Sequence, residues 1–211
     1  QNIKKNDGTP YKVFTPFYRN GCLDQTEPEK HNMFKEVVNF NKFEESQNLE
    51  NVCKLTKKTW EKNIVKNWDM SESGAQRKWQ EFLEHGIGNY KNGRNFPNEK
   101  HVSQLSPYIH FGQISIRQLY HDAKKTGDNS DIAVFISELG WREFSYYLLH
   151  HFPNIKTENF QQKFNKFPWK FNQDYYQAWC YGKTGYPIVD AGMRELYQTG
   201  YMHNRLRMIC G

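Results

Sequence analysis

The strongest constraint on the fold is a long helical stretch that ends just before Pro153. Polar residues from Asp128 to Ser130 can cap its first turn, and its apolar residues keep the helical period as far as His151. One apolar face is predicted to consist of Ile132, Phe135, Leu139 and Tyr146.

Four further segments carry helical patterns, and none alternates convincingly as a strand does. Helices are expected near residues 73–86, 115–125, 187–200 and 202–209. In the last segment Met202, Leu206 and Ile209 recur at i, i+4 and i+7, as one apolar stripe would. No internal repeat is present, and the chain is predicted to be all-α.

Residues 1–58 are polar, rich in Asn and Lys, and poor in periodicity. Their run TPYKVFTPF predicts an extended or turn-rich segment, because each proline restricts the residue before it. We therefore predict an irregular linker over residues 1–58 and a helical domain over 59–211. Within that domain, residues 89–112 are predicted to form a loop, since Gly, Pro and Asn punctuate them.

The composition points to an anionic or flat partner without naming one. The formal charge is +6 and 16% of the residues are aromatic, which suits polyanions and stacking, although most rings would simply build the core. Four cysteines without paired spacing predict neither a zinc site nor disulfides, and so a reducing, intracellular setting. No apolar run approaches the ~18 residues of a membrane span. HExxH, GxSxG, Walker and GxGxxG patterns are missing, so metalloprotease, hydrolase, kinase and Rossmann functions find no support.

The stretch SELGWREF places four chemically useful side chains on one face of the long helix. Glu138, Trp141, Arg142 and Ser145 fall at i, i+3, i+4 and i+7. An acceptor, a stacking ring and a permanent cation together suit a polar aromatic base. The alternative is an intrahelical Glu138–Arg142 ion pair beside a half-buried tryptophan.

Two other stretches carry weaker signals. VSQLS supplies the hydroxyls of Ser103 and Ser106 and free backbone amides before a helix, which suits a phosphate, although such serines are more often caps or turn formers. YMHNRLRM places Asn204 and Met208 opposite the apolar stripe, with Arg205 on its flank. Here the alternative is a solvated basic face on an ordinary core helix.

Five motifs together resemble the photolyase/cryptochrome family in order and spacing: GRNFP, VSQLSPYIHFGQIS, ELGWREF, GKTGYPIVDAGMREL and YMHNRLRM. The similarity covers residues 8–211 and favours the class I cyclobutane pyrimidine dimer photolyases. It implies a helical FAD-binding domain, truncated at both ends and preceded in the full protein by an α/β antenna domain. A folate- or deazaflavin-type antenna chromophore would belong to that missing domain.

The resemblance assigns cofactor contacts to a second set of residues. FAD would be contacted by Tyr90, Val102, Ser103, Gln104, Leu105, Ser106, Phe135 and Arg142. Phe135 stands where relatives often have Trp or Gln, so its contact would be apolar only. VSQLS replaces the commoner TSRLS, so a threonine hydroxyl and an arginine are lost from the phosphate site.

The same resemblance places the DNA and the dimer against two helices. Glu138 would hydrogen-bond the dimer, Trp141 would stack on it, and Asn204, Arg205 and Met208 would face it. Trp169 aligns with the surface tryptophan that ends the family's electron-transfer relay, the alternative being an exposed packing residue. DNA contacts are expected from Arg94, Glu138, Leu139, Gly140, Trp141, Arg142, Glu143, Phe144, Ser145, Lys183, Asn204 and Arg205.

The implied activity is light-driven, FAD-dependent repair of cyclobutane pyrimidine dimers in DNA, by a cytoplasmic protein acting as a monomer without metal or membrane. A (6-4) photolyase is disfavoured, because Asn204 stands where that enzyme has a histidine. A cryptochrome photoreceptor, which signals without repair, remains an alternative. So does a fragment that binds DNA nonspecifically through its basic surface alone.

Overall fold

A computed structural model describes residues 3–25, 27–30 and 59–211. Over these residues the secondary structure consists of helices and connecting segments without a strand, so the prediction of an all-α fold is confirmed. The chain divides into two compact units. Of the described residues, 3–25, 27–30 and 71–176 belong to the first unit, and 59–70 and 177–211 to the second.

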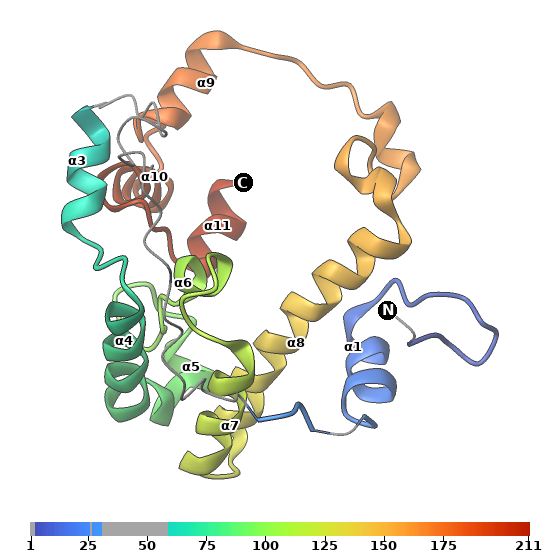
Figure 1. Ribbon diagram of the computed structural model, residues 1–211. Helices are drawn as coiled ribbons and strands as arrows, with labels where there is room; N and C mark the ends of the chain where they lie inside the picture. The colour runs from blue at the N-terminus through green and yellow to red at the C-terminus, as the bar shows by residue number, and fades with distance from the viewer. Residues whose placement is uncertain (1–2, 26, 31–58) are drawn as a thin grey trace, which may run out of the picture. The chain divides into compact units, whose positions relative to one another are not determined.

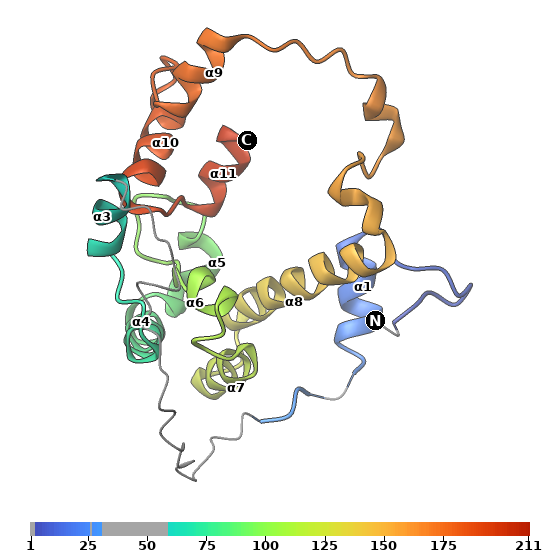
Figure 2. The ribbon, with the colours of Figure 1, turned by 45° about the horizontal axis from the view of Figure 1, so that its top comes forward.

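The first unit is built on the long helix α8 (Ser130–His151), with α7 beside its start and α1 beside its later turns in Figures 1 and 2. Its other elements are α1 (Phe14–Phe17), the π-helical turn η1 (Tyr18–Cys22), α4 (Glu72–His85), η2 (Ile87–Asn89), α5 (Tyr90–Gly93), α6 (Ser106–His110), α7 (Ile116–Thr126), η3 (Pro153–Lys156) and η4 (Gln162–Lys166). The helices expected near 73–86, 115–125 and 130–151 are therefore confirmed. The predicted loop 89–112 is wrong in part, because α5 and α6 lie inside it.

Helix α8 begins and ends where its sequence predicts. Asn129 caps the start, because its side-chain oxygen accepts hydrogen bonds from the backbone amides of Asp131 (2.9 Å) and Ile132 (3.1 Å). The helix ends at His151, and Pro153 follows two residues later. Ile132 and Phe135 are buried as expected, but Tyr146 is 54% exposed. Phe144 and Tyr147 are buried in the later turns, because the N-terminal segment packs on that side.

An aromatic cluster covers the first half of α8. Trp79 of α4 is fully buried, and its ring stacks on Phe82 and on Phe135 of α8 at 5.8 and 5.5 Å. The Tyr90 ring meets Phe82 and Phe135 edge-on, at 5.6 and 5.5 Å. Trp79 Nε1 also donates a hydrogen bond to Asp122 of α7 at 3.2 Å. These contacts join four helices of the unit through one group of rings.

The N-terminal segment packs on the second half of α8. Tyr11 and Phe17 are buried with Phe144 and Tyr147, and the Tyr147 hydroxyl donates to the Ile3 carbonyl at 2.7 Å. The same hydroxyl accepts from the Tyr11 amide at 3.1 Å. The prediction of an irregular linker over residues 1–58 is therefore wrong at residues 14–22, where aromatic burial stabilises a helical turn. The described residues 3–13, 23–25 and 27–30 are irregular as predicted, and residues 31–58 lie outside the described part of the chain.

Gly140 allows this packing to be close. A Cβ atom at position 140 would lie 2.7 Å from two carbon atoms of the Tyr18 ring, nearer than real Cβ contacts come. Because glycine has no side chain, the ring of η1 can lie directly against the backbone of α8.

The second unit contains α3 (Thr59–Lys66), α10 (Pro187–Thr199) and α11 (Asn204–Cys210), and α9 (Gln173–Cys180) leads the chain into it. The helices expected near 187–200 and 202–209 are confirmed, whereas α3 and α9 were not predicted. Met193, Met202 and Leu206 form the core, with Val189 and Cys210 packed against them. Ile209, expected on the apolar stripe, is 50% exposed. The helix begins only at Asn204, after Met202, so the side of the helix that faces the core contains Leu206 and Cys210 instead of Ile209.

A buried carboxylate organises the turn before α10. Asp190 accepts hydrogen bonds from the amide and hydroxyl of Thr184, both at 2.7 Å, and from the Gly185 amide at 3.0 Å. Arg194 donates to the Gly182 carbonyl at 2.6 Å, and Gly182 and Gly185 both have positive φ angles. The turn that carries the exposed Lys183 is thus held at both ends.

Replacing Gly140 by alanine should weaken the docking of the N-terminal segment. Overpacking costs about 1–3 kcal/mol, and the helix propensity gained is about 1 kcal/mol, so a net loss is expected. Urea denaturation should show a lower midpoint, and hydrogen exchange at residues 11–22 should accelerate. Gly88→Ala is the control, because nothing lies within 4 Å of its added Cβ. Equal stability of Gly140→Ala and the parent protein would contradict the close approach.

Asp190 should make stability depend on pH. The hydrogen bonds from Thr184, acting against burial, lower the pKa of Asp190 below its ordinary value of 3.8. Its stabilising contribution is therefore complete above 3.8 and is lost as the pH falls through the lower folded-state pKa. In urea titrations at several pH values, Asp190→Asn should be less stable than the parent at neutral pH, and the difference should vanish in acid. The exposed Asp174→Asn serves as control. A constant difference at every pH would overturn this assignment.

Candidate cofactor and nucleic-acid site

Glu138 of α8 is ion-paired with Arg94, which follows α5. The contact joins Arg94 Nη1 to Glu138 Oε1, and both side chains are largely shielded from solvent. Burial opposes the charge of Arg94, but the hydrogen bond and attraction of Glu138, with Tyr90 nearby, outweigh it and raise the pKa of Arg94. The expected alternative, an intrahelical Glu138–Arg142 pair, is wrong, because Arg94 occupies Glu138 instead.

Arg142 turns toward the next turn of the same helix. Its guanidinium lies 4.7 Å from the centre of the Tyr146 ring and donates to that hydroxyl at 3.3 Å. It also lies 3.8 Å from the carboxylate of Glu143. The proposed contact of Arg142 with flavin or dimer stays a prediction.

The indole of Trp141 is covered on one face by a neighbouring ring and is exposed on the other. The ring of Phe14 stacks on it with centroids 3.7 Å apart and planes 13° from parallel. Phe144 meets the same indole edge-on at 6.0 Å. Trp141 nevertheless remains 46% exposed, so the face away from Phe14 is open to a stacking partner. Phe14 was missed at the sequence level, because the TPYKVFTPF run carried no helical signal.

The VSQLS loop is held by a cation from another helix. Lys78 Nζ of α4 donates to the Gln104 side-chain oxygen at 2.9 Å, and Gln104 adopts a left-handed φ of +52°. Ser103 accepts from the Leu105 amide at 3.4 Å, while Ser106 opens α6 with an exposed side chain. Val102 is half-buried and Leu105 fully buried. Lys78 was missed because nothing in the sequence links two residues 26 positions apart.

Two residues assigned to the cofactor lie in the core of the first unit. Tyr90 and Phe135 are buried against each other and against Phe82. The guanidinium of Arg94 lies 5.4 Å from the centre of the Tyr90 ring, which couples this cluster to Glu138. Direct flavin contacts by Tyr90 and Phe135 stay predictions.

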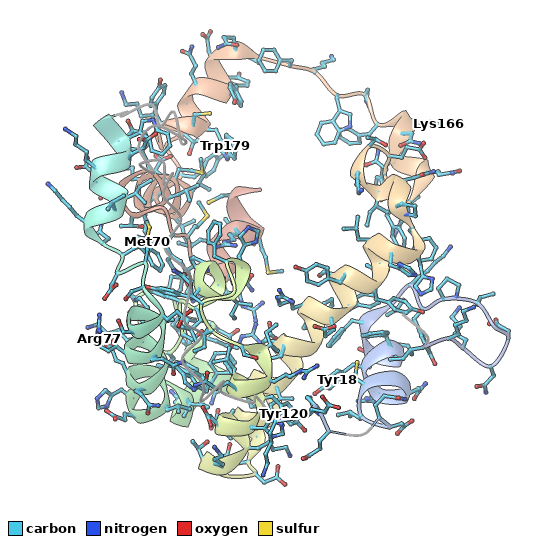
Figure 3. The ribbon with its side chains drawn as sticks, in the orientation of Figure 1. Tyr18, Met70, Arg77, Tyr120, Lys166 and Trp179 are labelled. Atoms are coloured by element: carbon cyan, nitrogen blue, oxygen red, sulfur yellow. The ribbon has the colours of Figure 1, made fainter. Side chains whose placement is uncertain are left out.

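The first unit contains a cavity of about 1,060 Å³ between η1, α7 and α8. Tyr18 and Tyr120, both labelled in Figure 3, line it, and burial is the main cause that raises the pKa of each phenol. Four residues expected to face DNA also line it: Leu139, Gly140, Arg142 and Glu143. Of the remaining DNA-facing predictions on α8, Phe144 is buried and Ser145 is exposed, with its hydroxyl bonded to the Trp141 carbonyl at 3.0 Å.

In the second unit, α11 exposes the polar side predicted for it. Asn204 is exposed and Met208 is 70% exposed, while Arg205 Nη1 lies 3.7 Å from the Met208 sulfur. His203 caps the helix, its Nδ1 accepting from the Arg205 amide at 3.2 Å. These residues belong to the second unit, whereas Glu138, Trp141 and Arg94 belong to the first.

Trp169 lies in the last part of the first unit and is 80% exposed, with the Phe167 ring 4.6 Å away. Its surface position agrees with the place expected for it, and its relay role stays a prediction. In the described ranges, no three His, Cys, Asp or Glu side chains gather as metal ligands would. None of the helices there combines the length and apolar character needed to cross a bilayer.

Known proteins similar to this chain include photolyases and cryptochromes. The family model for the FAD binding domain of DNA photolyase matches residues 135–211. A deoxyribodipyrimidine photo-lyase of Agrobacterium fabrum is 38% identical over 98% of this chain and 44% of its own length. Cryptochrome-2 of Arabidopsis thaliana is 37% identical over 69% of this chain and 26% of its own.

A solved structure extends the similarity to the fold. The crystal structure of a bacterial class III photolyase from Agrobacterium tumefaciens matches 99% of this chain and 44% of its own chain, with a TM-score of 0.90 and 38% identity. The chain thus spans less than half the length of these relatives. The predicted preference for class I stays a prediction, since that solved relative is of class III. The matched length, the sequence identity and the fold all agree, and the chain belongs to the photolyase/cryptochrome family.

Proposed function

We propose that the protein containing this chain repairs cyclobutane pyrimidine dimers in DNA, using light and FAD. The observation that carries the proposal is Trp141, whose indole is fixed on one face and open on the other, one helical turn from the carboxylate of Glu138. A rigid ring beside an acceptor suits a nucleobase that has left the duplex. The photo-lyase relatives support the same assignment.

The donor set around the VSQLS loop fits the phosphates of FAD. Ser103 and Ser106 offer hydroxyls, and Lys78 places a cation on Gln104. This cation stands in for the arginine that the loop lacks, because its charge reaches the loop from α4. FAD, when bound in its reduced form and excited by light, would supply the electron that splits the cyclobutane ring and then recover it.

The chain itself would bind and orient the dimer. The open face of Trp141 would stack on it, and Glu138 would accept a hydrogen bond from a base N–H. Arg94 engages Oε1 of Glu138, and a carboxylate has lone pairs on both oxygens, so capacity for this bond remains. Because Arg94 orients the carboxylate before DNA arrives, less ordering is needed on binding.

Phosphate contacts would come from cations on the exposed faces. Lys183 stands on the turn organised by Asp190, and Arg205 lies on α11. Such contacts would position the strand without reading its sequence. The proposal includes a monomeric, intracellular protein and an antenna chromophore outside this chain.

A cryptochrome-type photoreceptor is the second candidate, because Cryptochrome-2 of Arabidopsis thaliana is nearly as similar to the matched part of the chain. Both functions would use FAD and light. They differ in whether dimers disappear from DNA, which an assay measures directly.

Light-dependent loss of dimers from an irradiated oligonucleotide, catalysed by the full-length protein, is the first test. Trp141→Ala should weaken binding of that oligonucleotide by about 1–3 kcal/mol, the scale of a lost stacking contact. Trp169→Phe, far along the chain on an exposed surface, is the control for binding in the dark. Tight binding of FAD with no repair under light would favour the photoreceptor. Unchanged affinity in Trp141→Ala would contradict the stacking role.

Lys78 should matter for FAD affinity. Lys78→Gln is expected to weaken FAD binding about tenfold, or ~1.4 kcal/mol, near the lower range for a hydrogen bond to a charged group. Lys78→Arg should restore most of it, and raising the salt concentration should reduce the difference. Arg77→Gln, an exposed cation on the same helix labelled in Figure 3, is the matched control. Equal losses in Arg77→Gln and Lys78→Gln would show a general charge effect.

A further inference from the structure

Three aromatic rings of the first unit lie in a row. Tyr18 and Phe14 stack with centroids 5.3 Å apart and planes 18° from parallel. Phe14 and Trp141 stack at 3.7 Å and 13°. Trp141 is thus the end of the row, and its free face is where a fourth flat group would continue it.

Phe144 supports this row from the side. Its ring meets Phe14 edge-on at 5.9 Å and Trp141 edge-on at 6.0 Å. Phe144 is buried among Tyr11, Phe17 and Tyr147, so it provides a fixed wall. The indole is therefore bounded by one ring face, that of Phe14, and by one ring edge, that of Phe144.

An exposed tryptophan on a helix surface would otherwise sample several rotamers. A partner that stacks on such a ring must first order it, and that cost lowers the affinity. The stacked ring of Phe14 restricts the indole to one orientation before any partner binds. The entropic cost of ordering the indole is therefore not incurred on binding. Leucine or alanine at position 14 would leave Trp141 present and chemically intact but free to turn.

We propose that Phe14 is a positioning residue for Trp141, which fixes the indole so that its open face receives a base extruded from DNA. The identity of that base rests on the proposed function, whereas the positioning of Trp141 does not. Phe14 thereby gives the N-terminal segment a role in recognition, in addition to covering the core.

The positioning can be measured without DNA or light. In full-length protein labelled with 5-fluorotryptophan, Trp141→Phe assigns the ¹⁹F resonance of Trp141. The parent protein should give one sharp, shifted resonance for it, and Phe14→Leu should move it toward the exposed-indole position or broaden it. Phe14→Tyr, which retains a flat ring, should preserve the parent signal. An unchanged resonance in Phe14→Leu would overturn the proposal.

A double-mutant cycle tests the consequence for binding. Phe14→Leu should weaken binding of dimer-containing DNA about 3- to 10-fold, the scale of ordering one side chain. In a Trp141→Ala background the same change should have less than about a twofold effect, because no indole remains to be positioned. An equal loss in both backgrounds would overturn the proposal.

Phe17→Leu is the matched control for simple loss of packing. Phe17 lies on the same helix, and its ring packs on Phe144 and Tyr147 at 5.1 and 4.7 Å. This variant should lower stability yet leave the ¹⁹F signal of Trp141 in place. If it reproduced both effects of Phe14→Leu, undocking of α1 would explain them and the positioning role would be wrong. If Trp141→Ala itself left DNA affinity unchanged, the stacking part of the proposed function would fail, and the ¹⁹F result would still decide the positioning of the indole.

Discussion

The contact between Tyr18 and the bare backbone at Gly140 is the constraint on which the docking of the N-terminal segment onto α8 depends. Because position 140 has no side chain, η1 lies against α8, and α1 follows with Phe14 and Phe17. Phe17 then completes the core around Phe144 and Tyr147. Phe14 covers one face of Trp141. The packing of the N-terminal segment on the second half of α8 and the covering of one face of Trp141 thus both depend on one close approach.

The charged groups of the candidate site are held by partners distant in sequence. Glu138 pairs with Arg94 across 44 positions, and Gln104 binds Lys78 across 26. Each pair joins a helix to a loop or a short helix, so the charges are oriented by the fold before a ligand binds. Such preorganisation lowers the cost of binding, because fewer side chains remain to be ordered.

Membership of the photolyase/cryptochrome family limits the candidate functions to those of photolyases and cryptochromes, but it does not decide between the two. Photo-lyases and cryptochromes are similar to this chain at comparable identity over their matched parts. The open indole of Trp141 lies beside the acceptor Glu138, and Lys78 places a cation at the VSQLS loop. These features concern the binding and positioning of a ligand. The matched photo-lyase of Agrobacterium fabrum is longer, and this chain spans 44% of its length.

The sequence by itself determined the helical class, the position of α8 with its Asn129 cap, and the family, because period, caps and motif spacing are local or ordered along the chain. It also brought Glu138 and Trp141 onto one helix. Only the tertiary structure decided that Glu138 pairs with Arg94 rather than Arg142, that Lys78 reaches Gln104, and that residues 14–22 are helical. These outcomes depend on which surfaces meet, and in particular on the space left at Gly140. No local pattern encodes such a meeting, since Tyr18 and Gly140 lie far apart in the sequence.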